Sequence, residues 1–304
     1  MIRRVFWVWT GLAVFIAALF RISTTGLGLE LPPGQFADMR APTIAGCFGS
    51  DFAGRNNKWS LSRCTFGVEG SIGKLLVVGD STAASMSDGV IEAARRFNFS
   101  VIVFPSRGCS FMVRQPYTYE WCADYYRQAQ NLIESLQPNG LVISNYLSRM
   151  DIEDRRVPLP SGALPESKNA RLNSTIMSFE EGIIETQQSH SKMPILIIHE
   201  VPTIQINLKP SLLFNRSREA AINKKSPSYL RQREYVDAVN FVVKGFGVIS
   251  VLDPSIELCS KQSCSARSPK GIFYYMDSYH LNPIGARLLS PKVSEWISSL
   301  GDSG

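Results

Sequence analysis

Five short apolar segments recur along the chain, and their spacing limits the fold class. They are LLVV at 75–78, VIVF at 101–104, LVIS at 141–144, ILII at 195–198 and VISVL at 248–252. Each is too short for a helix and lacks polar alternation, as expected of strands buried on both faces. The stretches between and after them are long enough for helices, which we expect at about 83–97, 119–137, 177–190, 228–244 and 284–299. This alternation predicts an α/β fold with helices on both faces of a mostly parallel sheet.

The N-terminus carries one long apolar segment. Residues 5–20 contain no charged side chain, and as a helix the span 2–22 would cover about 30 Å, the thickness of a hydrocarbon core. Arg3 and Arg4 precede it, which favours a cytoplasmic N-terminus and an exported remainder. A signal peptide cleaved near 24–26 is the alternative, but the length of the apolar run favours an uncleaved anchor.

These features divide the chain into three parts. We expect a transmembrane anchor at 1–22, a linker rich in Gly, Pro and Thr at 23–46, and one globular domain at 47–304. Within the domain, the polar, proline-bearing segments 150–176 and 202–227 are predicted loops. Loops at the carboxyl ends of parallel strands surround the ligand crevice, so these two either shape substrate access or are inert surface.

The six cysteines fall into three groups of neighbours in the sequence. Spacing alone leaves their pairing open. A zinc site is the main alternative to disulfides, but the chain has no C-x-x-C motif and contains only three histidines. Export into an oxidising compartment favours disulfides, and we expect no metal or other cofactor. The predicted pairs are Cys47–Cys64, Cys109–Cys122 and Cys259–Cys264.

The charge distribution argues against a nucleic-acid partner. The net charge is +6, but the Lys and Arg residues are scattered along the chain. Binding of DNA or RNA requires a clustered basic face. An ordinary solvated surface is the better interpretation.

The segment LLVVGDSTAAS at 75–85 places a hydroxyl between a buried strand and a helix. In one interpretation Gly79 and Asp80 form a turn and Ser81 caps the helix. In the other, Ser81 is a nucleophile, which needs a base to accept its proton and a group to orient that base.

Three histidines could supply the base. His190 lies in a polar helix end and is expected to be solvated, and His199 follows the strand 195–198. His280 follows Asp277 by three residues, so the carboxylate could bond one ring nitrogen while the other faces outward. A hydrogen-bonded loop histidine without a catalytic role is the alternative.

A strand that ends in Gly-Asp-Ser, with Asp-x-x-His-Leu near the end of the domain, resembles the SGNH (GDSL-type) hydrolase superfamily. The resemblance implies a flavodoxin-like, three-layer α/β/α fold with a central sheet. It also implies that Ser81 is the nucleophile, Asp277 the acid and His280 the base. Gly108 and Asn145 would join Ser81 in the oxyanion hole, which requires preorganised donors around the developing negative charge.

The cysteine pattern around these motifs resembles that of one branch, the periplasmic SGNH domain joined to multi-spanning membrane acyltransferases that O-acylate surface glycans. Those relatives are multi-spanning, whereas the sequence here predicts one span, so the expected protein is a single-pass protein of the bacterial inner membrane with its catalytic domain in the periplasm. A glycan would be the acyl acceptor, and a separate membrane acyltransferase could supply the acyl group. That branch usually has histidine after the nucleophile, where this chain has Thr82.

Three functions therefore stay open. The resemblance favours an O-acyltransferase that acetylates a cell-envelope or surface polysaccharide. A carbohydrate O-acetyl esterase would use the same serine acyl-enzyme, with water as the acceptor. A non-catalytic, glycan-binding scaffold for an acyltransferase is the third possibility.

Overall fold

The computed structural model describes residues 46–48, 59–68, 70–113, 121–148, 168–204, 221–270 and 272–301. The predicted anchor 1–22, and all but the last residue of the predicted linker 23–46, lie outside these ranges. Within them, no helix is both long and apolar enough to cross a membrane.

A six-stranded sheet forms the centre of the fold, in the order β1-β3-β2-β4-β5-β7. Five strands are parallel and correspond to the five apolar segments, and β1 pairs with β3 in the antiparallel direction. The mostly parallel α/β sheet predicted from the sequence is thus confirmed, with one antiparallel strand at its edge. The strands are β1 (Thr65–Phe66), β2 (Gly73–Gly79), β3 (Phe99–Pro105), β4 (Gly140–Ser144), β5 (Ile195–Ile198) and β7 (Ile249–Leu252).

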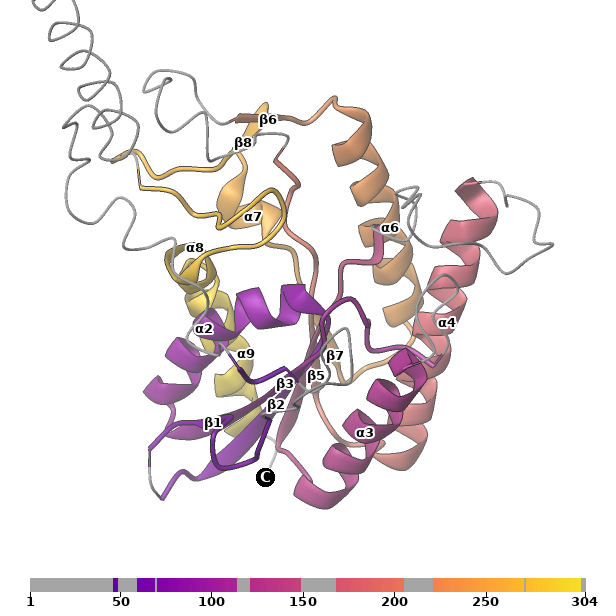
Figure 1. Cartoon of the computed structure of the whole chain (residues 1–304), viewed down its shortest axis with the longest axis vertical. Helices are drawn as coiled ribbons and strands as arrows, with labels where there is room; N and C mark the ends of the chain where they lie inside the picture. Colours follow the sequence, from indigo (N-terminus) through magenta and orange to yellow (C-terminus); the bar gives the residue numbers. More distant parts are fainter. Residues whose placement is uncertain are drawn as a thin grey trace, which may run out of the picture. The chain divides into compact units, whose positions relative to one another are not determined.

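Helices cover both faces of the sheet (Figure 1), because consecutive apolar residues in each strand point to opposite sides. On β2, Leu75 and Val77 pack in one hydrophobic cluster with residues of the first helix group, whereas Leu76 and Val78 pack in a second cluster with the other group. The first group is α2 (Ser81–Arg96), α8 (Pro283–Arg287) and α9 (Ser290–Gly301); the second is α3 (Trp121–Leu136), α4 (Lys168–Ser189) and α6 (Pro227–Val243).

The segment predicted as one helix at 284–299 is helical but forms two helices instead of one. α8 ends at Arg287 and α9 begins at Ser290. Pro291 explains the break, since proline has no N–H to donate and is tolerated only in the first turn of a helix. The second residue of α9 is such a position.

Two further differences concern elements whose sequences carry little periodicity. α4 starts at Lys168, so the last part of the segment 150–176 is helical rather than a loop. A small antiparallel sheet of β6 (Ala221–Asn223) and β8 (Ser263–Ser265) was not predicted. Each of its strands has three residues, which is too short for an alternating pattern to be recognised. The short helix α7 (Ser255–Leu258) precedes β8.

Candidate active site

The turn between β2 and α2 presents Ser81 at the carboxyl edge of the sheet. Gly79 ends β2 with a φ of +134°, a conformation that favours glycine. A Cβ atom at this position would collide with the carbonyl oxygen of Ser144 at the end of β4. Glycine is therefore required here both for the turn and for the close approach of the neighbouring strand.

Asp80, not Ser81, caps helix α2. Its Oδ1 accepts hydrogen bonds from the backbone N–H of Thr82 at 2.8 Å and from the Thr82 hydroxyl at 2.7 Å. Ser81 is the first residue of the helix. The interpretation of Ser81 as the cap is therefore wrong, because the preceding carboxylate already satisfies the helix terminus.

The Ser81 hydroxyl instead contacts His280. Ser81 Oγ lies 2.7 Å from His280 Nε2, and His280 Nδ1 lies 2.6 Å from Asp277 Oδ2. The other carboxylate oxygen of Asp277 accepts hydrogen bonds from the backbone N–H groups of Tyr279 and His280 at 2.9 and 2.8 Å. The three side chains thus form the continuous hydrogen-bonded series that a serine nucleophile requires.

The environment of Asp277 keeps it ionised. Burial alone would raise the pKa of this carboxyl, but its hydrogen bonds and the charge of His280 hold the pKa below its ordinary value. A carboxylate anion beside Nδ1 keeps the proton on that nitrogen, which leaves Nε2 free to accept the Ser81 proton.

Hydrogen bonds within the chain fix the loop that carries Asp277 and His280. The backbone N–H of Met276 donates to the His280 carbonyl at 2.9 Å, which closes the turn. Asn282 then caps α8 by accepting from the Gly285 N–H at 2.9 Å, and its amide donates to the Phe273 carbonyl at 2.8 Å. The helix start therefore anchors the loop immediately after the histidine.

Gly108 and Asn145 lie in segments that leave β3 and β4. Gly108 has a φ of +78°, which favours glycine at this turn. The Asn145 side chain pairs with the backbone of Phe111: its Oδ1 accepts from the N–H at 2.9 Å and its Nδ2 donates to the carbonyl at 3.3 Å. One N–H of the amide stays available for another acceptor. Asn145 thus ties together the two segments in which an oxyanion hole is expected.

The other two histidines have different surroundings. His199 Nε2 lies 2.9 Å from Asn240 Oδ1, and burial lowers the pKa of this imidazole. His190 lies directly after α4 and is half-buried, and its Nε2 is buried without a hydrogen-bond partner, so this residue is less solvated than we expected.

All six cysteines form disulfides, in the pairs Cys47–Cys64, Cys109–Cys122 and Cys259–Cys264. These are the sequence-local pairs predicted above. Cys109 follows Gly108 directly, so its disulfide constrains the segment after β3. Among the residues described, no group of His, Cys, Asp or Glu side chains has the arrangement of a metal site.

Three residues of this region were not predicted. Tyr146 stacks on Tyr279, with 5.3 Å between the ring centroids, and Tyr279 also contacts His280. Glu200 is buried at the end of β5, and its Oε1 has no hydrogen-bond partner. The sequence signal for all three was their position: each lies at the carboxyl edge of a strand or beside the candidate base.

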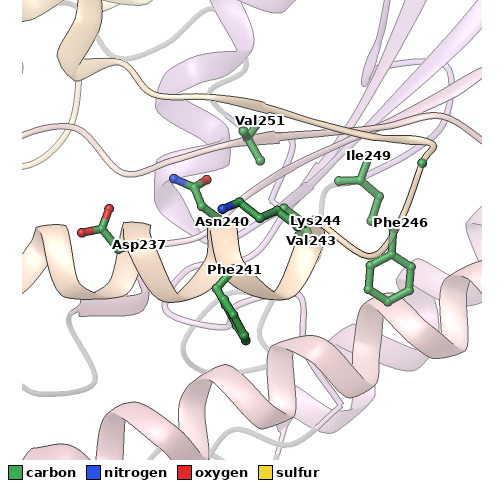
Figure 2. A pocket seen from close by; sticks show the side chains of 9 residues that line it. Asp237, Asn240, Phe241, Val243, Lys244, Phe246, Ile249 and Val251 are labelled. Carbon is green, nitrogen blue, oxygen red and sulfur yellow. The ribbon is translucent and has the colours of Figure 1, made fainter.

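A hollow lies away from these residues, between α6 and the edge strand β7 (Figure 2). Its volume is about 700 Å³, and Phe241, Phe246 and Val251 contribute apolar side chains to it. None of the residues that line it belongs to the Ser81–His280–Asp277 series.

Comparison with known proteins supports the fold. The family described as "SGNH domain (fused to AT3 domains)" matches residues 46–295. No curated protein matches significantly. The periplasmic domain of a lipopolysaccharide acetyltransferase from Salmonella ser. Paratyphi A is similar, with a TM-score of 0.59 and 14% identity over 83% of this chain and 91% of that one.

More distant similarity reaches two other structures. One is a salicylyl-acyltransferase from a tetracycline biosynthetic pathway, with a TM-score of 0.45 and 14% identity over 77% of this chain and 56% of that one. The other is an acetyl xylan esterase from the rumen bacterium Butyrivibrio proteoclasticus, with a TM-score of 0.41 and 10% identity over 78% and 66% of the two chains.

Proposed function

This chain belongs to the family of SGNH domains fused to AT3 domains, and we propose that it transfers an acyl group through an ester on Ser81. The observation that carries the proposal is the hydrogen-bonded series from Ser81 through His280 to Asp277. A serine hydroxyl is a weak nucleophile by itself, and an adjacent oriented base is what activates it.

The reaction has two balanced halves. His280 Nε2 accepts the Ser81 proton while Oγ attacks the carbonyl carbon of the acyl donor. The tetrahedral intermediate collapses when His280 returns the proton to the leaving oxygen, which produces the Ser81 ester and a free alcohol. An acceptor hydroxyl then loses its proton to His280, attacks the ester, and is acylated as Ser81 regains its proton.

Asp277, Gly108 and Asn145 support these steps. Asp277 holds the imidazole tautomer and stabilises the imidazolium that forms during each attack. The backbone N–H groups of Ser81 and Gly108 and the remaining amide N–H of Asn145 are our candidates for the oxyanion hole. The proposed reaction needs no cofactor, because His280 transfers the protons and Asp277 and the oxyanion donors stabilise the charges that develop.

We favour a sugar hydroxyl as the acceptor, and hence an O-acetyltransferase acting on a cell-envelope or surface polysaccharide. The family's fusion to AT3 domains supports association with a membrane acyltransferase. Hydrolysis by water, as in a carbohydrate esterase, shares every step up to the Ser81 ester. A non-catalytic glycan-binding scaffold is disfavoured, since binding alone does not need the complete series of three side chains.

The proposed cellular location is based on the N-terminal segment and on the cysteines. We propose that residues 1–22 anchor the chain in the bacterial inner membrane, that 23–46 link this anchor to the catalytic domain at 47–304, and that the domain lies in the periplasm. Arg3 and Arg4 support the orientation, and the disulfides support an oxidising compartment. A separate multi-spanning membrane acyltransferase would supply the acyl group.

The test uses the full-length chain with a chromogenic acetyl ester and with a fluorophosphonate that labels activated serines. We expect the native chain to be labelled on Ser81 and to release the chromophore, and Ser81→Ala to do neither. Transfer is separated from hydrolysis by adding an oligosaccharide and measuring acetylated sugar by mass spectrometry. A native chain that is neither labelled nor active would contradict the enzyme and favour the scaffold.

A further inference from the structure

The phenol ring of Tyr279 contacts the imidazole of the proposed base. The centroids of the Tyr279 and His280 rings are 4.4 Å apart, and their planes are inclined by 53°. The His280 side chain is 12% exposed, so this contact is largely shielded from water.

Tyr146 holds the Tyr279 ring in place. The two phenol rings stack with 5.3 Å between centroids and 19° between planes. Tyr146 is itself fixed at both ends, because its backbone N–H donates to Asp80 at 2.7 Å and its hydroxyl lies 3.2 Å from the Thr203 hydroxyl. The contact between Tyr279 and His280 is thus supported by a neighbour from another strand end.

The face of an aromatic ring attracts a cation that lies over it within about 6 Å of the ring centroid, and the attraction strengthens where water is excluded. His280 is neutral when it accepts the Ser81 proton and becomes a cation during the attack. A ring beside it therefore interacts more strongly with the transition state than with the ground state, which is the condition for accelerating a reaction.

We propose that Tyr279 is a positioning residue that stabilises the protonated form of His280, with Tyr146 keeping the Tyr279 ring against the imidazole. The contribution to the reaction rate rests on the proposed function, whereas the effect on His280 protonation does not. Neither tyrosine belongs to the three-residue series that defines the site.

Substitutions at Tyr279 leave in place the other charged and polar groups that influence the protonation of His280. Asp277 is bonded directly to the imidazole, and Ser81 lies on its other side. Among the residues that the structure describes, Asp80 after β2 and Glu200 after β5 carry further carboxyl groups, and both are buried. Substitution of the Tyr279 side chain also retains its backbone hydrogen bond to Asp277.

The experiment titrates His280 directly by NMR. The chain has only three histidines, so imidazole-labelled full-length protein gives few signals, and His280→Gln identifies the signal of interest. We expect the His280 midpoint to fall by about half a pH unit in Tyr279→Leu, because loss of the ring removes stabilisation of the cation. Tyr279→Phe keeps the ring and should leave the midpoint unchanged.

A shape-preserving substitution covers the case in which leucine disturbs folding. Pentafluorophenylalanine in place of Tyr279 keeps the size of the ring but weakens its attraction for cations, so its midpoint should also lie below that of Tyr279→Phe. Equal midpoints in these two proteins would overturn the proposal, because they would show that the ring acts only by filling space.

Kinetics separates this inference from the proposed function. The acid limb of kcat/KM for a chromogenic ester should move to lower pH with the His280 midpoint, while the plateau falls about three-fold. A native chain without turnover would contradict the proposed function but not the titration result. A reduced plateau with an unmoved acid limb and an unmoved NMR midpoint would overturn the role of Tyr279 in protonation.

Discussion

Asp80 Oδ2 accepts a hydrogen bond from the backbone N–H of Tyr146 at 2.7 Å, which ties the end of β2 to the chain leaving β4. The Ser110 hydroxyl donates to the same oxygen at 3.2 Å, from the segment after β3. The other oxygen caps α2 through Thr82. One buried carboxylate thus joins the three segments that surround Ser81, although sequence analysis assigned Asp80 only to a turn.

Asp80→Asn should damage both stability and activity. The amide can still cap α2 with its oxygen, but its NH2 group would then face the Tyr146 N–H, so two donors would meet in a buried site. We expect the free energy of unfolding to fall by about 2 kcal/mol. Turnover should fall about ten-fold or more, since a displacement of catalytic groups of about 1 Å has large kinetic effects. Denaturant unfolding and ester turnover measure the two effects.

Ser226→Ala is the matched control. The Ser226 hydroxyl caps α6 by accepting from the Tyr229 N–H at 3.3 Å. Its removal should cost about 1 kcal/mol of stability and leave turnover unchanged. If Asp80→Asn behaves in the same way, Asp80 is only a helix cap and does not position the site.

Ser81→Ala should have effects opposite to those of Ser226→Ala: it should leave stability almost unchanged and abolish turnover. Because Asp80 provides the cap, loss of the Ser81 hydroxyl should change the free energy of unfolding by less than about 0.5 kcal/mol. Turnover and the covalent adduct should nevertheless disappear. His280→Ala should lose nearly as much activity, because members of such a series act as a unit. Thermal unfolding and ester turnover are measured on the same Ser81→Ala protein. Full turnover by this variant would contradict the proposal that Ser81 is the nucleophile.

The strands and most helices could be predicted because apolar periodicity reports burial. Strands buried on both faces, such as 75–78, are continuous apolar runs. The helices between such parallel strands then connect them and cover the faces of the sheet. The break before Pro291 was not predicted, although proline within the expected helix 284–299 is a signal for it, since proline removes a helical hydrogen bond. The pairing of β6 with β8 was not, because it joins three-residue strands that are far apart in sequence.

Local geometry alone predicted only the part of the site that neighbouring residues form, and the pairing of Ser81 with the distant His280 was expected from the family resemblance. Asp277 and His280 lie three positions apart, so their contact could be expected from local geometry. The contacts that Tyr146 makes with Asp80 and Tyr279 depend on strand order, which brings β2 and β4 together across a long separation in sequence. No local pattern encodes that order.

The disulfide Cys109–Cys122 should matter for activity as well as stability. Cys109 follows Gly108, a candidate oxyanion donor, so the disulfide restrains that segment. Replacing both cysteines with serine should cost about 3 kcal/mol in the chain-entropy model and lower the turnover of the folded fraction. Thermal unfolding combined with active-site titration separates these two losses.

Cys47–Cys64 provides the comparison, since the two loops have similar lengths, with sequence separations of 17 and 13. Its removal should cause a similar stability loss but retain turnover per folded molecule. Equal effects of the two double variants on turnover would argue that the Cys109–Cys122 disulfide has no special influence on the site.

Glu200→Gln should make the protein more stable at alkaline pH. Glu200 is 5% exposed, and one of its carboxyl oxygens has no hydrogen-bond partner. Burial raises its pKa well above the ordinary value of 4.5, despite hydrogen bonds from Ser148 that lower it. The native fold therefore favours the neutral acid.

The sign of the pH effect follows from this raised pKa. The stability that Glu200 contributes is fully present below the pKa of the unfolded chain and is lost as pH rises through the pKa of the folded protein. Glutamine resembles the neutral acid and cannot ionise. The melting temperatures of the two proteins should therefore agree near pH 4.5 and diverge progressively toward about pH 9, with Glu200→Gln the more stable. Parallel melting curves across this range would mean that Glu200 is already ionised or exposed to water in the folded protein. Asp277 cannot produce the same divergence, because its lowered pKa makes its contribution disappear on acidification instead.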